Sequence, residues 1–339
     1  MQKENYMNLP NRVAQRGILF TALLSFVLSV GVQQAKAQYN FNLVDAPGST
    51  DQNNTVISGI NDAGVTVGYD DTSGPNLSFI RSSSGVFTRL NVGGSSFTYA
   101  GGINNANQVV GIYNISGFTH SFLWQGGVYT NFDVPGAIRT YARGINDSGT
   151  IVGDWRDASF VSHAFLRTSN GAFTTFDIAP NLTAFNLLGI NNLGQTVGAF
   201  SADPSQQIFT PFLRAADGAL TTFATPGFDH VVANGINDLG QITGFIQNNA
   251  SGEEHGFVRQ SNGILTYLDS DPLTYYQTIG NDINNRGVIV GEVDDITNFD
   301  AHGFIATAVV PEPGSLALLL TTILGGIGLV VRRRHLHLV

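Results

Sequence analysis

The sequence contains no cysteine among its 339 residues. Disulfide bonds, zinc sites with thiolate ligands and cysteine nucleophiles are therefore excluded. It also lacks the Gly-x-Ser-x-Gly element of serine hydrolases, the His-Glu-x-x-His element of zinc proteases and a glycine-rich loop that could hold phosphates. No catalytic residue and no metal site is therefore indicated by a motif.

Lysine is scarce, and none of it lies between residues 38 and 308. In that segment nine arginines stand against 23 aspartates and glutamates, which leaves a formal charge of about −14. Because the field of such a body repels phosphate, nucleic acid and anionic lipid are not expected as partners. Cations and neutral glycans remain open as ligands.

Two long apolar runs occur, one near each end of the chain. The first, residues 18–32, follows a basic segment and precedes Ala35 and Ala37, which form an Ala-x-Ala cleavage site. This order is typical of a secretory signal peptide over residues 1–37, which delivers a chain to the Sec translocon. Mature protein is then predicted to begin at Gln38.

The second run, residues 315–331, is long enough to cross a membrane as a helix. A basic cluster follows it and should stay in the cytoplasm, which places the preceding domain on the far side. A short Pro-Glu-Pro element precedes it. The candidate residues of this C-terminal signal are Pro311, Glu312, Pro313, Arg332, Arg333 and Arg334.

Residues 309–339 resemble a PEP-CTERM sorting signal, because the Pro-Glu-Pro, the apolar span and the terminal arginines follow in the same order. The resemblance implies a bacterial envelope protein that is recognised by an exosortase, an integral-membrane cysteine protease, and is commonly made alongside exopolysaccharide. It also implies a transient inner-membrane anchor followed by release to the cell surface or extracellular matrix. An ordinary C-terminal anchor is the alternative.

A ten-residue stretch recurs six times between the two ends, most clearly over residues 144–153, at spacings of 42 to 47 residues. Each repeat contains four short runs of β-prone residues closed by turn residues, and none has the period of a helix. Units of this length and content predict an all-β, six-bladed β-propeller over residues 38–308. The repeats begin at Gly59, Gly102, Gly144, Gly189, Gly235 and Asp282.

The turn residues predict two hairpin types. The Asn-Asp-x-Gly turns suit a type I turn whose last residue, such as Gly149, has a positive φ; Asn107 takes that place in the second repeat. A second set predicts type I′ turns. This set contains Ser84-Gly85, Gly126-Gly127, Asn170-Gly171, Asp217-Gly218 and Asn262-Gly263.

The sixth repeat ends without a fourth strand, and residues 39–48 match the missing segment. The N-terminal strand is therefore predicted to complete the last blade and close the ring.

The repeats resemble extracellular HAF repeats, named for a His-Ala-Phe tripeptide that stands here as residues 163–165. Variant forms contain His120, His255 and His302. The resemblance implies secretion and carries no known activity. Because radial repetition places these histidines in different blades, hydrogen-bonded structural roles are favoured over a shared metal.

One loop departs from the consensus and is the candidate binding site: Asp154, Trp155, Arg156 and Asp157. Its aromatic ring and two carboxylates would suit stacking and polar contact with a sugar. Acidic loops that follow the second strands allow weak Ca²⁺ binding, and no other cofactor is expected. Two functions remain: a non-enzymatic binding or structural propeller of the envelope, or a secreted glycan-cleaving enzyme on the same scaffold.

Overall fold

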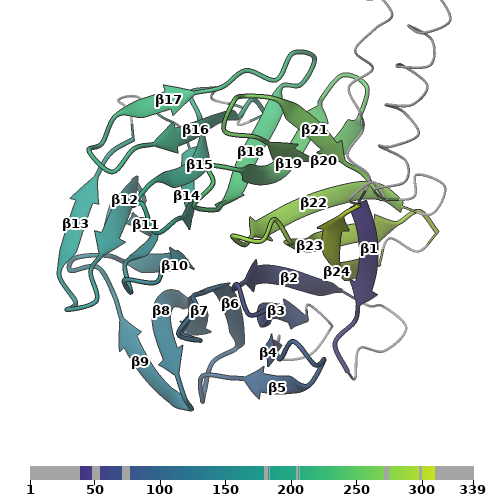
Figure 1. Ribbon diagram of the computed structural model, residues 1–339. Coiled ribbons are helices and arrows are strands. Elements are labelled where there is room, and N and C mark those ends of the chain that lie inside the picture. Colours follow the sequence, from purple (N-terminus) through teal and green to yellow (C-terminus); the bar gives the residue numbers. More distant parts are fainter. Residues whose placement is uncertain are drawn as a thin grey trace, which may run out of the picture. The chain divides into compact units, whose positions relative to one another are not determined.

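The computed structural model describes residues 39–47, 54–70, 77–178, 182, 184–203, 205, 207–270, 275–297 and 300–309. These residues form six four-stranded antiparallel sheets arranged as the blades of a propeller (Figure 1). No helix long and apolar enough to cross a membrane occurs within these ranges. The predicted signal peptide, sorting signal and membrane span lie outside the described residues.

The blades are numbered I to VI in chain order. Blades I to III contain β2 (Thr55–Ile60), β3 (Thr66–Asp70), β4 (Leu77–Arg81) and β5 (Phe87–Leu90); β6 (Phe97–Ile103), β7 (Val109–Ile115), β8 (Phe118–Gln125) and β9 (Val128–Phe132); β10 (Arg139–Ile145), β11 (Ile151–Arg156), β12 (Ser162–Arg167) and β13 (Phe173–Phe176). Blades IV to VI contain β14 (Ala184–Ile190), β15 (Thr196–Ser201), β16 (Thr210–Arg214) and β17 (Leu220–Thr222); β18 (His230–Ile236), β19 (Ile242–Asn248), β20 (Glu253–Arg259) and β21 (Leu265–Leu268); β22 (Tyr275–Ile283), β23 (Ile289–Asp295), β24 (Ala301–Ala308) and β1 (Tyr39–Val44).

In the core of each blade, one phenylalanine of the third strand packs over one glycine of the second strand. In blade III a Cβ added to Gly153 would lie 1.9 Å from the carbonyl oxygen of Tyr141 and 2.9 Å from the ring of Phe165. Only glycine therefore allows the third-strand ring to cover the second strand. The six equivalent rings are fully buried: Phe79, Phe122, Phe165, Phe212, Phe257 and Phe304.

The turns between first and second strands are as predicted. Gly149 has φ 77° and donates its N–H to the carbonyl of Asn146 at 3.0 Å. Asn107 takes the same conformation in blade II with φ 56°. The prediction of a left-handed residue at this position is confirmed.

The prediction of type I′ turns between third and fourth strands is wrong in four of five cases. Only Gly126 and Gly127 both have positive φ, at 57° and 93°. In the other turns the glycine alone is left-handed, as at Gly171 with φ 91°. Because Ser, Asn and Asp stay right-handed at lower cost, those turns adopt the same type I turn with a glycine bulge as the first set. The corrected pairs are Ser84-Gly85, Asn170-Gly171, Asp217-Gly218 and Asn262-Gly263.

Blade VI joins the two ends of the described chain. β1 pairs antiparallel with β24, from Tyr39 opposite Ala308 to Val44 opposite Gly303, and forms the outer edge of the sheet (Figure 1). The ring of Phe41 lies 5.0 Å from that of Phe304. The first and last described strands therefore share one sheet and one core.

Candidate functional site: the central channel

The first strand of every blade lines the axis of the ring, and each carries a bulge. In blade III the register shifts between Ala142 and Gly144, so that Arg143 is the extra residue. A bulge re-aims a side chain, and here the extra residue of each first strand lines the axial cavity. The six residues differ widely in chemistry: Ser58, Gly101, Arg143, Leu188, Asn234 and Asn281.

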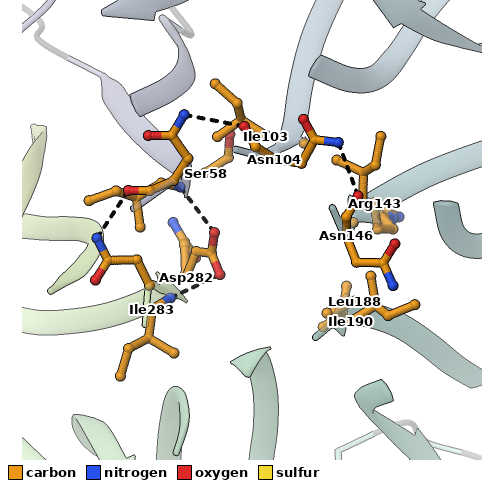
Figure 2. A pocket seen from close by; sticks show the side chains of 18 of the residues that line it. Ser58, Ile103, Asn104, Arg143, Asn146, Leu188, Ile190, Asp282 and Ile283 are labelled. Atoms are coloured by element: carbon orange, nitrogen blue, oxygen red, sulfur yellow. Dashed lines mark hydrogen bonds between the residues drawn. The ribbon is translucent and has the colours of Figure 1, made fainter. Parts of the chain in front are cut away.

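The cavity, which we call the central channel, has a volume of about 280 Å³ and is formed by all six blades (Figure 2). One of its mouths is ringed by the Asn-Asp turns. Its lining contains one cationic side chain, Arg143, and five carboxylates. These are Asp62, Asp147, Asp238, Asp282 and Glu292.

Six buried asparagines form a closed circle of hydrogen bonds near this mouth, which we call the inner amide ring. Each side-chain amide donates to the carbonyl of the equivalent asparagine in the next blade, as from Asn104 to Asn146 at 3.0 Å (Figure 2). Asn284 of blade VI donates to Asn61 of blade I at 3.0 Å and completes the circle. The members are Asn61, Asn104, Asn146, Asn191, Asn237 and Asn284.

The next residue of each turn forms a second circle, the carboxylate–amide ring, in which Asp and Asn alternate. The amide of Asn105 donates to the carboxylates of Asp62 and Asp147, both at 2.9 Å. Each backbone N–H also donates to the side chain of the following blade, as from Asp147 to Asn192 at 2.8 Å. The members are Asp62, Asn105, Asp147, Asn192, Asp238 and Asn285.

The hydrogen bonds of this ring favour ionised carboxylates. Partial burial acts to raise the pKa of Asp62, but donation from Asn105 and Asn285 and the charge of Arg286 outweigh it and hold the pKa below its ordinary value. The mouth of the central channel therefore carries negative charge at neutral pH.

Asp282 stands where the other five repeats have glycine. One carboxylate oxygen accepts the N–H of Ile60 from blade I at 3.0 Å, and the other accepts the N–H of Ile283 at 2.9 Å (Figure 2). Burial raises its pKa to about 6 despite these two bonds. Asp282 therefore joins blade VI to blade I and places a carboxyl group in the channel.

Glu292 follows the core glycine of β23 and also lines the channel. Burial, with the nearby charge of Asp294, raises its pKa to about 7. The residue is partly buried, and no hydrogen bond to its carboxylate occurs among the described residues. Glu292 is thus a carboxylate of the channel lining that takes no part in the hydrogen bonds between blades.

Arg143 is held on the opposite side of the ring, in blade III. Its Nε lies 3.4 Å from Asp154 Oδ1, and its guanidinium lies 5.2 Å from the ring centre of Tyr141. Burial raises the pKa of Asp154, although Arg143 opposes the shift. The charge of Arg143 is thus offset by Asp154 and not by the channel carboxylates.

The residues of the predicted binding loop make contacts within blade III. Asp154 is buried beside Arg143, and Trp155 has one face stacked on His163 with ring centres 4.6 Å apart. The indole N–H of Trp155 is buried without an acceptor among the described residues.

Asp157 accepts backbone N–H groups of its own loop, from Ser159 and Val161, both at 2.8 Å. Arg156 is partly buried at the end of β11 and pairs with Arg139 in register. Sugar binding by this loop stays a prediction.

Each histidine of the repeated tripeptide is paired with an aspartate that follows the fourth strand of its blade. His163 Nδ1 lies 2.7 Å from Asp177, and His302 Nδ1 lies 2.9 Å from Asp45. Blades I and IV lack the histidine and also lack the aspartate. The two residues therefore form one structural unit that joins the third and fourth strands. The other two pairs are His120 with Asp133 and His255 with Asp269.

The acids that follow the second strands lie toward one rim but do not converge. Within the described ranges no group of three His, Cys, Asp or Glu side chains is close enough to hold a metal ion directly. Weak Ca²⁺ binding by these loops stays a prediction.

The partly buried carboxyl group of Glu292, whose pKa is raised, should make stability depend on pH. Because its pKa is raised in the folded protein, the folded state holds the proton longer than the unfolded chain, and the free energy of unfolding should fall between about pH 4.5 and pH 7. Glu292→Gln should match the wild type at about pH 5 and exceed it by about 1 to 3 kcal/mol at about pH 8. Urea unfolding of the full chain in detergent, without divalent cations, measures this difference.

The control for that experiment is Asp217→Asn, which removes an exposed acid from the β16–β17 turn. It removes one negative charge at an exposed position and so reports the effect of net charge alone. An equal pH dependence in Glu292→Gln and the wild type would contradict the assignment.

The chain is similar to known proteins in structure but hardly in sequence. No family model matches the chain, and no curated protein matches it. Among solved structures, a protein described as a gluconolactonase shares 10% identity over 82% of this chain and 95% of its own, with a TM-score of 0.48. TolB from Acinetobacter baumannii shares 10% over 89% and 71%, with a TM-score of 0.45. The Trypanosoma rangeli sialidase shares 10% over 84% and 61%, with a TM-score of 0.42. At these values the similarities carry no conclusion about what this chain does.

Proposed function

We propose that this chain is an exported bacterial envelope or extracellular-matrix protein whose propeller is a non-enzymatic binding or structural body. The Sec translocon exports it, and residues 1–37 are removed after Ala37. The segment 315–331 then holds it in the inner membrane until an exosortase cleaves near Pro311. The freed ring reaches the cell surface or matrix, where exopolysaccharide or another envelope component is its partner.

The observation that carries this proposal is the pairing of the two chain ends in blade VI. Tyr39 lies opposite Ala308 at the outer edge of that blade. The predicted cleavage after Ala37 and the sorting element at Pro311 both lie within a few residues of this pair. Removal of both ends would leave every strand of blade VI in place, so the processed product is a whole ring closed by β1.

The contacts of the polar residues favour binding over catalysis. The four tripeptide histidines are each tied to an aspartate, and Asp282 is tied to two backbone N–H groups. Residues held in this way maintain the shape of the ring. The six bulge residues of the central channel, which are of five residue types, are the positions at which such a scaffold can vary its ligand without changing its blades.

Replacing Pro311, Glu312 and Pro313 together by alanine tests the sorting route. The variant should stay in the inner membrane at full mature length, because an exosortase would not recognise it. Cell fractionation followed by mass spectrometry of the carboxyl terminus measures this. A matched control, Pro135→Ala in the β9–β10 loop, should be processed as the wild type is. Wild-type protein recovered from the cell surface with Val339 still attached would exclude the route.

A glycan-cleaving enzyme is the second candidate, and one observation favours it. Asp282 and Glu292 line the same cavity, and burial raises their pKa values to about 6 and about 7, where a carboxylic acid can donate a proton near neutral pH. A reducing-end assay on exopolysaccharide with the wild type and Glu292→Gln decides between the two functions. Release that is lost in the variant would establish the enzyme; no release from either protein is expected for the binding role.

A further inference from the structure

A second cavity lies at the seam between blade I and blade II, which are neighbours in the ring (Figure 1). Its volume of about 600 Å³ is within the range of about 300 to 1,000 Å³ that is typical of sites for small molecules. We call it the seam groove. It is formed mainly by Ile80, Val86 and Thr88 of blade I and by Asn107, Trp124 and Gln125 of blade II.

Trp124 departs from the pattern of the other repeats. It lies on the third strand, opposite the first residue of the second strand, and four other blades have an arginine at that position. The guanidinium carbon of each arginine lies over a phenylalanine ring, 4.3 to 5.8 Å from the ring centre. Trp124 packs against the core cluster of blades I and II, but within the described chain its indole has no ring contact and no cation–π partner. Its half-buried ring therefore borders an open groove. The four arginines are Arg81, Arg167, Arg214 and Arg259.

Two further departures of the same repeat meet at this groove. Asn107 replaces the glycine that ends the first turn of the other five repeats. The connection that contains Gly126 is also short, since residues 125–128 stand where blade III has residues 168–172. These departures come from two turns and a strand, and all of them line the seam groove. Because function on a shared fold resides in local sites and not in the scaffold, departures that meet in space indicate a site.

The lining of the groove indicates an uncharged ligand with polar groups. No charged side chain lines it, although the propeller as a whole is strongly acidic and repels anions. The amide oxygen of Asn107 accepts from Asn61 at 2.9 Å, and that of Gln125 accepts from Gln108 at 3.2 Å. Among the described residues no acceptor occupies the amide N–H groups of Asn107 and Gln125. A purely apolar ligand would cover these donors without replacing their water, which costs free energy.

A sugar ring has both of the required properties. Its C–H groups can pack on the face of an indole, and its hydroxyl groups accept hydrogen bonds from amides. We infer that the seam groove binds a neutral oligosaccharide, with one sugar ring on Trp124 and its hydroxyl groups on Asn107 and Gln125. The inference rests on the proposed binding role, for which it names a surface and a ligand class. The site is distinct from the central channel and from the loop of Trp155.

The test is a fluorescence titration of the full chain in a detergent without a sugar headgroup. The probes are four neutral hexasaccharides: cellohexaose, maltohexaose, mannohexaose and chitohexaose. The chain contains two tryptophans, Trp124 and Trp155, so one replacement assigns the signal. We expect a saturable change of emission with at least one probe. Trp124→Arg, which introduces the residue of four other repeats, should abolish that change and weaken binding by calorimetry at least about tenfold.

Gln125→Ala is the second variant, and it keeps the test informative if Trp124→Arg does not fold. Gln125 is exposed, so its replacement should leave the fold intact and weaken binding about threefold. The matched control is Thr168→Ala, which changes the equivalent exposed position of blade III and should bind as the wild type does. Equal affinity in the wild type and every folded groove variant would overturn the inference.

Three other results would also overturn it. The first is the absence of saturable binding of all four hexasaccharides to the wild type. The second is an emission change that persists in Trp124→Arg, because the sugar would then lie at Trp155. The third is a response to octanol and to none of the sugars, which would identify an apolar ligand. None of these results bears on export, which is tested separately by the mass of the carboxyl terminus.

Discussion

Deleting residues 39–46 should lower the free energy of unfolding by about 5 kcal/mol or more, enough to unfold many domains of ordinary stability. The deletion removes all of β1, with buried Val44 and Ala46 and the ring contact of Phe41 with Phe304. It also removes the bond from Ala46 N–H to Thr55 Oγ1 at 3.0 Å, which ties blade VI to blade I. The exposed edge of β24 would then invite association between copies.

Urea unfolding of the full chain in detergent measures this effect. The control replaces the outward-facing Asn40 and Asn42 by serine, which leaves the pairing with β24 intact. Addition of a synthetic peptide of residues 39–47 should restore part of the lost stability in the deleted protein. A transition midpoint equal to that of the control would show that β1 does not close the ring.

Asn146→Ala should cost about 3 to 5 kcal/mol, although it removes only one small side chain. Asn146 is buried, donates to Asn191 of the next blade at 3.1 Å and accepts the N–H of Thr150 at 3.0 Å. Alanine removes one of the two donors to the Asn191 carbonyl, which keeps the N–H of Gly194 at 3.1 Å. It also leaves the N–H of Thr150 without an acceptor and opens the inner amide ring. Thermal or urea unfolding provides the measurement.

Two further variants separate the two roles of this side chain. Asn146→Asp keeps the acceptor for Thr150 but places a carboxylate oxygen against the carbonyl oxygen of Asn191, so at neutral pH its cost should be at least that of alanine. Asn170→Ala makes the same change in an exposed turn of the same blade and should cost less than about 1 kcal/mol. Equal costs at Asn146 and Asn170 would mean that the ring contributes nothing to stability.

The features that sequence predicted well are local ones. The repeat period predicted the blades, and the Asn-Asp-x-Gly turns predicted the conformations of Gly149 and Asn107. These depend on residues a few positions apart, whose preferences are known from short segments. The type I′ assignment was wrong because two turn types compete at the same local level. A right-handed backbone conformation costs Asn170 or Asp217 less free energy than the left-handed one that a type I′ turn requires.

The central channel could not be predicted in the same way, because it depends on which residues of different blades meet. Asp282 carried a visible signal as the one departure from the anchor glycine. Glu292 carried none, since its position after a core glycine faces the channel only when the ring is formed. Trp155 and its neighbours stood out for their chemistry, yet the structure uses them within blade III.

The carboxylate–amide ring also restricts the number of blades that the propeller can have. Each Asn gives its two amide hydrogens to the acids on either side, so the pattern is satisfied only when every neighbour is of the other kind, as Asp62, Asn105 and Asp147 are. Around a closed circle that is achieved only with an even number of positions. A five- or seven-bladed ring of these repeats would be frustrated: two acids, or two amides, would have to stand side by side. In chemical terms the unit of this propeller is therefore a pair of blades taken three times, and insertion or loss of repeats should be tolerated by twos.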